Sequence, residues 1–268
     1  ICFYSEYMLL TSYIVIGILG GFVGGFLGLG GGIIFVPFLF FTFDYFQINP
    51  NYALQSAIVT SLSCVVISSL SALIKHNKND LVEWDIFTRT LPGIVLGSSL
   101  GLTMVTILPT GYIKFIYTVL LVFISIYMFN KNQDYEEQKI KEIRYVNRFS
   151  IFVGSISSLL GIGGGTLTTP YFNYYGVPIK RCIATASACG VAISLFGILL
   201  SFIFTHHLQI IKTNTIELLA FDAFIIVSLS SMLSAYFGAS VTKKTEASNL
   251  NKIFSVFLIL TAISILFY

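Results

Sequence analysis

GLGGG at residues 28–32 interrupts an apolar stretch over 8–41, and GIGGG at 161–165 interrupts a second apolar stretch over 145–175. Glycine is a poor helix former, and a break in a helix exposes backbone groups that lipid cannot hydrogen-bond. Irregular backbone at membrane depth is tolerated only where protein buries it or where it lines a watery cavity. We therefore expect both glycine runs to lie inside a membrane protein.

The composition supports this class of protein. Of the 268 residues, 56% are hydrophobic and 10% are charged, whereas soluble domains carry about 25% charged residues. A membrane helix needs roughly 20 apolar residues, and the alternating pattern of an outer-membrane barrel is missing. The sequence predicts an all-α polytopic membrane protein with apolar segments at 8–41, 53–74, 86–108, 112–130, 145–175, 182–204, 215–241 and 250–267.

The two halves of the chain resemble each other. Four glycines and a proline in 28–37 recur 133 positions later in 161–170. Farther along, AIVT at 57–60 resembles CIAT at 182–185. Internal repeats of this kind are typical of secondary transporters. We expect one transporter domain made of a first repeat (1–130), a cytoplasmic linker (131–148) and a second repeat (149–268).

The basic residues discriminate between two topologies. If the segments over 8–41 and 145–175 each cross the membrane once, nine lysines and arginines lie on one side and six on the other. If each is a hairpin with its glycine run at the tip, thirteen share one side and two lie opposite. The positive-inside rule favours the hairpins. Each repeat then has five membrane elements, so the second is inverted, both termini lie outside, and 131–148 lies in the cytoplasm beneath the cell inner (plasma) membrane.

The glycine tips are the candidate substrate site. Helix N-termini and successive glycine N–H groups carry partial positive charge, so they suit an anion. Hydroxyl groups nearby provide further donors, although membrane Ser and Thr often bond their own helix. The predicted substrate-binding residues are Gly30, Gly31, Gly32, Thr60, Ser61, Gly163, Gly164, Gly165, Thr166, Thr185 and Ser187.

Other glycines have a simpler interpretation. Gly17, Gly21 and Gly25, and likewise Gly97 and Gly101, have the small-xxx-small spacing that lets membrane helices pack closely. Three consecutive glycines exceed what such packing needs. We therefore expect the spaced glycines to serve helix packing and the two glycine runs, 28–32 and 161–165, to bind the substrate.

Several site classes are not indicated by the sequence. The glycine runs do not fit GxGxxG, and the basic residues lie in loops, so neither a nucleotide cofactor nor a nucleic-acid partner is expected. The four cysteines show no CxxC or metal-ligand spacing. No acidic residue lies deep in an apolar segment, so the sequence does not indicate which ion is coupled to transport. His76, with Lys75 and Lys78, is interpreted as part of a solvated loop cluster.

The motifs resemble a known family. GGFVGGFLGLGGGIIFVPFL at 20–39, GIGGGTLTTP at 161–170, His76 and Val82-Glu83-Trp84 are similar to the TauE/SafE family, which is described as sulfite exporters. The resemblance implies a permease for small sulfur-containing anions, such as sulfite, thiosulfate or organosulfonates like sulfoacetate. It also implies a glycine where Asp80-Leu81 stands in this chain.

Two other functions stay open at this point. An anion channel could use the glycine tips as a selectivity filter. An intramembrane enzyme acting on a sulfur compound could use Cys64 or Cys189 as nucleophile, although no catalytic motif is visible, so we expect a transporter and not an enzyme. Lipid is an expected partner, and a homo-oligomer is compatible with the sequence.

Overall fold

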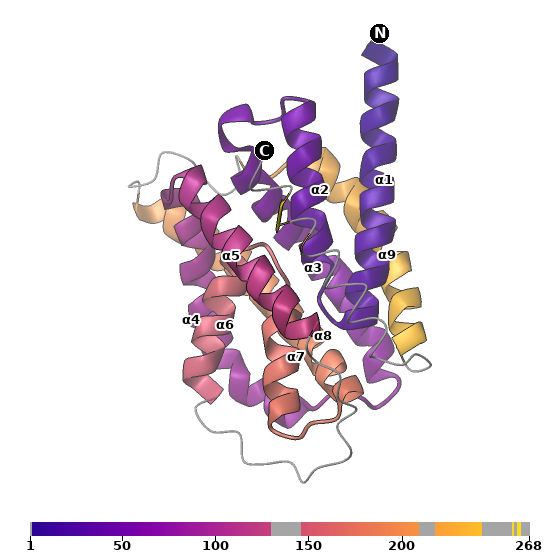
Figure 1. Cartoon of the computed structure of the whole chain (residues 1–268), viewed down its shortest axis with the longest axis vertical. Coiled ribbons are helices and arrows are strands. Elements are labelled where there is room, and N and C mark those ends of the chain that lie inside the picture. The colour runs from indigo at the N-terminus through magenta and orange to yellow at the C-terminus, as the bar shows by residue number, and fades with distance from the viewer. Residues whose placement is uncertain (1, 130–145, 209–217, 243–258, 260–261, 264–268) are drawn as a thin grey trace.

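The computed structural model describes residues 2–129, 146–208, 218–242, 259 and 262–263. Within these residues the chain is all-helical (Figure 1). Its elements are α1 (Cys2–Leu27), α2 (Gly32–Tyr45), the 3-10 turn η1 (Pro50–Tyr52), α3 (Ala53–Asn77), α4 (Trp84–Ile107), α5 (Thr110–Phe129), α6 (Val146–Leu159), α7 (Gly165–Tyr174), α8 (Ile179–Leu208) and α9 (Phe221–Thr242).

Five helices are long and apolar enough to cross a membrane: Glu6–Leu27, Pro50–Asn77, Trp84–Ile107, Ile179–Ile203 and Phe221–Thr242. Three shorter apolar helices are Gly32–Tyr45, Thr110–Phe123 and Arg148–Leu159. The all-helical, multi-pass class predicted from the sequence is thereby confirmed. The segment expected at 250–267 and most of the linker expected at 131–148 lie outside the described residues.

The chain reverses at the first glycine run. Gly28, Gly30 and Gly31 have φ of +70°, +70° and +83°, a backbone region that glycine adopts without strain. The N–H of Leu29 donates to the carbonyl of Gly24 at 3.0 Å and closes the turn. Helix α2 then returns along α1, so that residues 28–31 form the tip of a hairpin.

The second glycine run makes a similar turn. Gly161 and Gly164 have φ of +70° and +76°, and the N–H of Ile162 donates to Ser157 O at 2.8 Å. Helix α7 returns along α6, where the rings of Phe149 and Tyr171 stack with their centroids 3.5 Å apart. Residues 160–164 are therefore the tip of a second hairpin.

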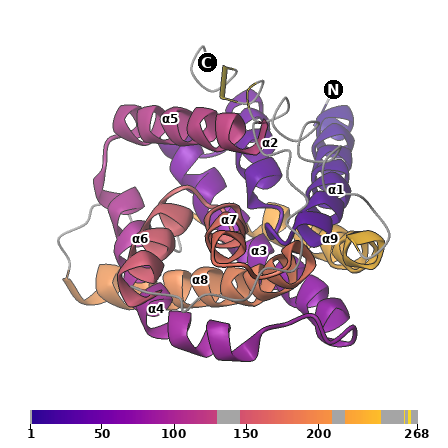
Figure 2. The same ribbon diagram turned by 60° about the horizontal axis from the view of Figure 1, so that its bottom comes forward.

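Helices from the two halves of the sequence interlock (Figures 1 and 2). Helix α1 packs along α9, and α6 packs along α4, while α3 and α8 contact each other and both hairpins. A Cβ on Gly17, Gly21 or Gly25 would meet α9, and one on Gly97 or Gly101 would meet α6. The packing role predicted for these spaced glycines is confirmed.

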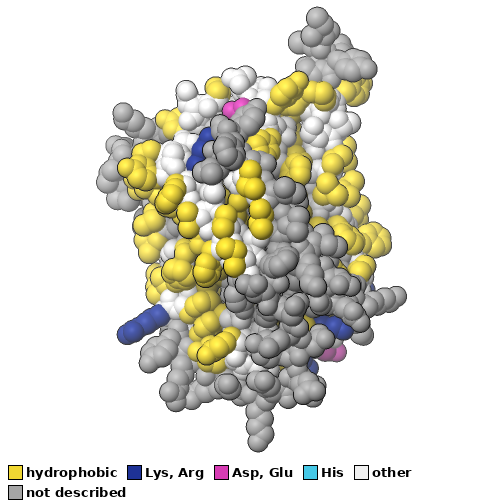
Figure 3. Space-filling view, in the orientation of Figure 1, with side chains coloured by type: hydrophobic (Ala, Val, Ile, Leu, Met, Phe, Trp, Pro, Cys, Tyr) yellow, Lys and Arg dark blue, Asp and Glu magenta, His cyan; other side chains and the backbone are white. Residues whose placement is uncertain are grey.

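The surface has the polarity of a membrane protein. Hydrophobic side chains cover most of the described face in Figure 3, and charged side chains gather toward its two ends. The C-terminal end of α3 and the N-terminal ends of α4, α6 and α8 all lie at the lower end of Figure 1. These helix ends carry Lys75, Arg89, Arg148, Lys180 and Arg181, so basic residues distant in sequence share one end of the molecule.

Candidate functional site

The two glycine tips touch each other through backbone atoms. A Cβ on Gly32 would lie 2.2 Å from Gly161 O, and a Cβ on Gly165 would lie 2.1 Å from Gly28 O. Gly32 and Gly165 are 133 positions apart, as are Gly28 and Gly161. The contact is therefore reciprocal: the first helical residue after each tip lies against the first glycine of the other tip.

Each tip is also the start of a helix. Gly31 and Gly164 are the N-cap residues of α2 and α7, and the first N–H groups of a helix have no partner within it. In the described chain, the N–H groups of Gly32 and Gly165 donate to no loop or cap carbonyl. The two helices thus bring buried donors and the positive ends of their dipoles to one place.

Helix α3 supports both tips with serine side chains. Ser61 Oγ donates to Gly161 O at 2.9 Å, and Ser68 Oγ donates to Gly30 O at 2.6 Å. Both hydroxyls are fully buried. Of the predicted hydroxyl residues, Ser61 therefore lies directly at the site, bonded to the first glycine of the second tip.

Thr60 and Thr185 occupy matching positions and make matching contacts. Thr60 Oγ1 accepts a hydrogen bond from the N–H of Ala220 at 3.1 Å, one residue before α9 begins. Thr185 Oγ1 accepts one from the N–H of Glu83 at 2.9 Å, one residue before α4 begins. Each threonine thus fixes the start of a helix, and its own O–H remains available as a donor.

The other two predicted hydroxyl residues differ in their surroundings. Ser187 Oγ donates to Ile183 O of its own helix at 3.2 Å. Thr166 is buried in the first turn of α7, next to the tip. The structure therefore brings Thr166 close to the glycines, whereas the Ser187 hydroxyl is engaged within α8.

Replacing Thr60 or Thr185 by valine is expected to destabilise the protein. Valine has nearly the same shape, but it leaves the N–H of Ala220 or Glu83 without its acceptor, which costs about 1–3 kcal/mol. Thermal unfolding in detergent should show a lower Tm for both variants. Thr118→Val is the matched control, because the Thr118 hydroxyl bonds only its own helix, at Lys114 O. Unchanged stability together with a weakened substrate response would contradict the docking role.

Three buried serines were not predicted, of which Ser69 and Ser157 lie beside the tips. Ser69, Ser157 and Ser194 are at most 1% exposed, and their Oγ atoms have no hydrogen-bond partner. A Cβ on Gly30 would lie 2.4 Å from Ser69 Oγ. A signal was present in the sequence, because Ser69 and Ser194 are 125 positions apart, the same separation as Thr60 and Thr185.

One sequence interpretation was wrong. His76 is fully buried, and its Nε2 atom lies 3.3 Å from Gly25 O of α1. The solvated cluster was expected because Lys75 and Lys78 flank it. The last turn of α3 instead packs against the first hairpin. One side of this turn therefore faces inward, and the imidazole of His76 lies on that side.

The two candidate cysteine nucleophiles are fully buried. Cys64 Sγ lies 3.9 Å from Phe224 O, and Cys189 Sγ lies 3.9 Å from Thr90 Oγ1. Among the described residues, no cluster of histidine, cysteine and acidic side chains could hold a metal. Among those residues, neither thiol lies beside a base that could generate a thiolate, which is the nucleophilic form.

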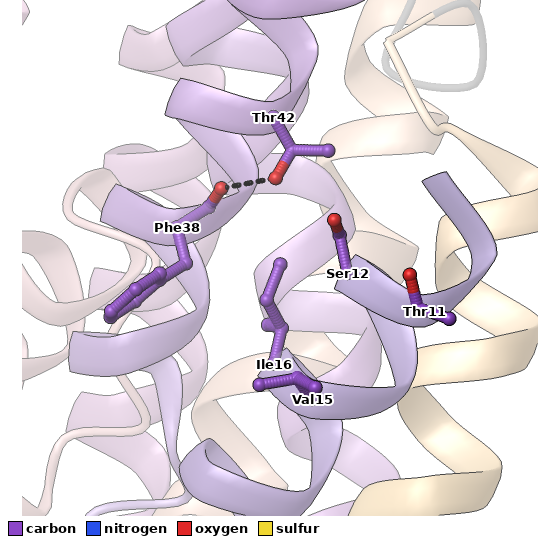
Figure 4. Close-up of a pocket in the computed structure, with 6 residues that line it drawn as sticks. All are labelled: Thr11, Ser12, Val15, Ile16, Phe38 and Thr42. Atoms are coloured by element: carbon purple, nitrogen blue, oxygen red, sulfur yellow. Dashed lines mark hydrogen bonds between the residues drawn. The ribbon is translucent and has the colours of Figure 1, made fainter. Parts of the chain in front are cut away.

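A groove of about 280 Å³ lies between α1 and α2, away from the tips (Figure 4). It is lined by Thr11, Ser12, Val15, Ile16, Phe38 and Thr42. Its hydroxyl groups donate to carbonyls of their own helices, such as Thr42 to Phe38 O at 2.8 Å. With no free donor turned into it, this groove does not resemble an anion site.

Comparisons with known proteins show similarity to membrane transporters. The chain is 25% identical over 253 residues to a probable membrane transporter protein of Haemophilus influenzae, covering 94% of this chain and 96% of the relative. It is 28% identical over 179 residues to a probable membrane transporter protein of Methanocaldococcus jannaschii, covering 66% of each chain. No solved structure matches it significantly. The family model described as sulfite exporter TauE/SafE matches residues 13–265, and the chain therefore belongs to the TauE/SafE family of membrane transporters.

Proposed function

We propose that this chain carries small sulfur-containing anions, such as sulfite, thiosulfate or sulfoacetate, across the cell inner membrane by alternating access. The observation that carries the proposal is the reciprocal contact between two glycine-tipped helix starts. Buried N–H groups and two helix dipoles converge there, and the buried residues that the structure describes include no lysine or arginine. Such a site can hold an anion and still release it.

The family supports the proposed substrate class. The matching family model is described as a sulfite exporter, and the two relatives are named as probable membrane transporter proteins. These names favour transport over catalysis by Cys64 or Cys189. Within the proposal, the backbone of Gly30–Gly32 and Gly163–Gly165 binds the anion, assisted by Ser61 and Thr166. The Oγ1 atoms of Thr60 and Thr185 accept hydrogen bonds from backbone N–H groups, and their own O–H groups are further donors to the anion.

The transport mechanism proposed here rests on two inverted repeats. The equivalent pairs are α1 with α6, α2 with α7, α3 with α8 and α4 with α9. The contacts respect this equivalence: α1 packs on α9 as α6 packs on α4, and Thr60 docks α9 as Thr185 docks α4. Inverted repeats that meet at broken helices are a common basis for alternating access. The basic helix ends at one end of the molecule support a cytoplasmic 131–148 linker and external termini.

The closed contact between the tips favours a carrier over a channel. Carbonyl oxygens of Gly28 and Gly161 lie directly against the opposite glycines, so the backbones leave no anion-sized passage between them. In a carrier this contact opens toward one side at a time as the two repeats rock. A selectivity filter would instead hold its donors around a continuous passage.

Reconstituted protein should exchange sulfur oxyanions. Proteoliposomes loaded with unlabelled sulfite, thiosulfate or sulfoacetate are given the labelled anion outside, with chloride as the comparison ion. We expect saturable uptake that depends on internal anion and excludes chloride. Fast, unsaturating chloride flux would establish the channel instead, and absence of uptake for all three sulfur anions would refute the proposed substrate class.

A further inference from the structure

We propose that Ser69, Ser157 and Ser194 supply hydroxyl donors to the transported oxyanion. The proposal rests on the proposed function and names additional residues of its binding site. All three side chains are buried to 99% or more, and none of their Oγ atoms has a hydrogen-bond partner. A buried hydroxyl without a partner is unfavourable, so such groups in a folded protein need a specific explanation.

Ser69 faces the first tip. Its Oγ would lie 2.4 Å from a Cβ on Gly30 and 2.9 Å from a Cβ on Gly190. A Cβ on Gly190 would in turn lie 2.7 Å from Gly163 O, in the second tip. The Ser69 hydroxyl therefore lies where the first tip, the second tip and α8 come together. The neighbouring Ser68 hydroxyl is already engaged with Gly30 O, which leaves Ser69 as the free donor on this turn of α3.

Ser157 faces the second tip. Its Oγ would lie 3.6 Å from a Cβ on Gly164, the N-cap residue of α7. Its backbone carbonyl accepts the hydrogen bond from Ile162 that closes the same turn. The carbonyl thus shapes the tip, while the hydroxyl beside it is left unpaired.

Ser194 repeats Ser69 in the second half of the chain. It lies 125 positions after Ser69, and the adjacent Ile193 contacts the position where Gly164 would carry a Cβ. Other buried hydroxyls of these two helices have partners: Ser63 bonds Val59 O, and Ser187 bonds Ile183 O. Among the described buried hydroxyls of α3 and α8, those of Ser69 and Ser194 are therefore the two without a partner, at equivalent positions of the proposed repeats.

Serine hydroxyls suit the chemistry of a sulfur oxyanion. Each can donate one hydrogen bond, and bonds to an ionised acceptor are about twice as strong as bonds between neutral groups. Because hydroxyls are neutral donors, they bind an anion without a charged lysine or arginine side chain being buried in the membrane protein. Unpaired in the closed state, these hydroxyls gain their partners when the tips part and the anion enters.

The test compares Ser69→Ala, Ser157→Ala and Ser194→Ala with Ser63→Ala as the matched control. Each variant is examined twice, by thermal unfolding in detergent without anion and by the concentration dependence of labelled sulfite and thiosulfate uptake in proteoliposomes. Because alanine removes an unpaired buried group, Tm should stay unchanged or rise in the three site variants. The half-saturating anion concentration should rise about tenfold or more, as expected for loss of a hydrogen bond to a charged group. Ser63→Ala should leave the half-saturating concentration unchanged.

Two results would overturn this inference while leaving the proposed function in place. One is wild-type half-saturation in all three serine variants. The other is a Tm that falls in step with activity, which indicates a structural role. If the wild-type protein itself transports neither sulfite nor thiosulfate, the proposed function fails and this inference fails with it.

Discussion

Replacing Gly165 by alanine is expected to reduce anion exchange at least tenfold. The new methyl group would lie 2.1 Å from Gly28 O, and a backbone oxygen cannot rotate away as a side chain can. Overpacking of this kind typically costs about 1–3 kcal/mol. Gly32→Ala should have a loss of similar size, because its methyl group would lie 2.2 Å from Gly161 O. Labelled sulfite uptake per reconstituted protein is the measurement.

Gly111→Ala provides the control for this pair. A Cβ at Gly111 would meet nothing within 4 Å, so uptake should remain at the wild-type rate. The double variant Gly32→Ala/Gly165→Ala should lose less than the two single effects combined, because both methyl groups separate the same pair of tips. Normal exchange by Gly165→Ala would show that the closed contact plays no part in transport.

Much of the fold could be predicted from the sequence. Runs of three glycines in apolar segments indicated the breaks, and the structure places turns at 28–31 and 160–164. Apolar length then set the helices to within a few residues, as at 53–74 against the observed Ala53–Asn77. These features are local, because they depend on glycine conformation and on the thickness of the membrane.

The packing partners could not be predicted in the same way. The residues of α1 do not indicate that this helix packs against α9, which lies more than 190 positions away in the sequence. The same limit applied to the site. Thr60 and Thr185 accept hydrogen bonds from the N–H groups of Ala220 and Glu83, which belong to distant segments. The Gly25 carbonyl beside His76 is also distant in sequence.

Asp80 shows a local feature that the sequence did not explain. The family resemblance implied a glycine at Asp80-Leu81, and the structure gives Asp80 a φ of +53°. Aspartate is among the few residues other than glycine that adopt this left-handed conformation at modest cost. The turn between α3 and α4 therefore keeps the backbone shape that a glycine would permit.

Gly25→Ala and Gly101→Ala are expected to cause the largest losses of stability. A Cβ on Gly25 would lie 2.1 Å from Ala235 O of α9, and one on Gly101 would lie 2.0 Å from Ser155 O of α6. Each substitution forces apart two helices that pack through their backbones, and such overpacking costs about 1–3 kcal/mol. Because α1–α9 and α4–α6 are the equivalent contacts of the proposed repeats, the two losses should be similar. Tm in detergent and the amount of membrane-inserted protein are the measurements.

Gly197→Ala separates this clash from a general effect of replacing glycine in a membrane helix. Gly197 is also buried in a helix, but the nearest atom to its Cβ position is 3.5 Å away, an ordinary contact. Alanine is a better helix former than glycine by about 1 kcal/mol, so Gly197→Ala should match or exceed the wild-type Tm. A fall in Tm of the same size in all three variants would mean that helix flexibility, rather than close backbone packing, is what these glycines provide. Falls in Tm confined to Gly25→Ala and Gly101→Ala would instead show that stability depends on close backbone packing at both contacts, α1 with α9 and α4 with α6.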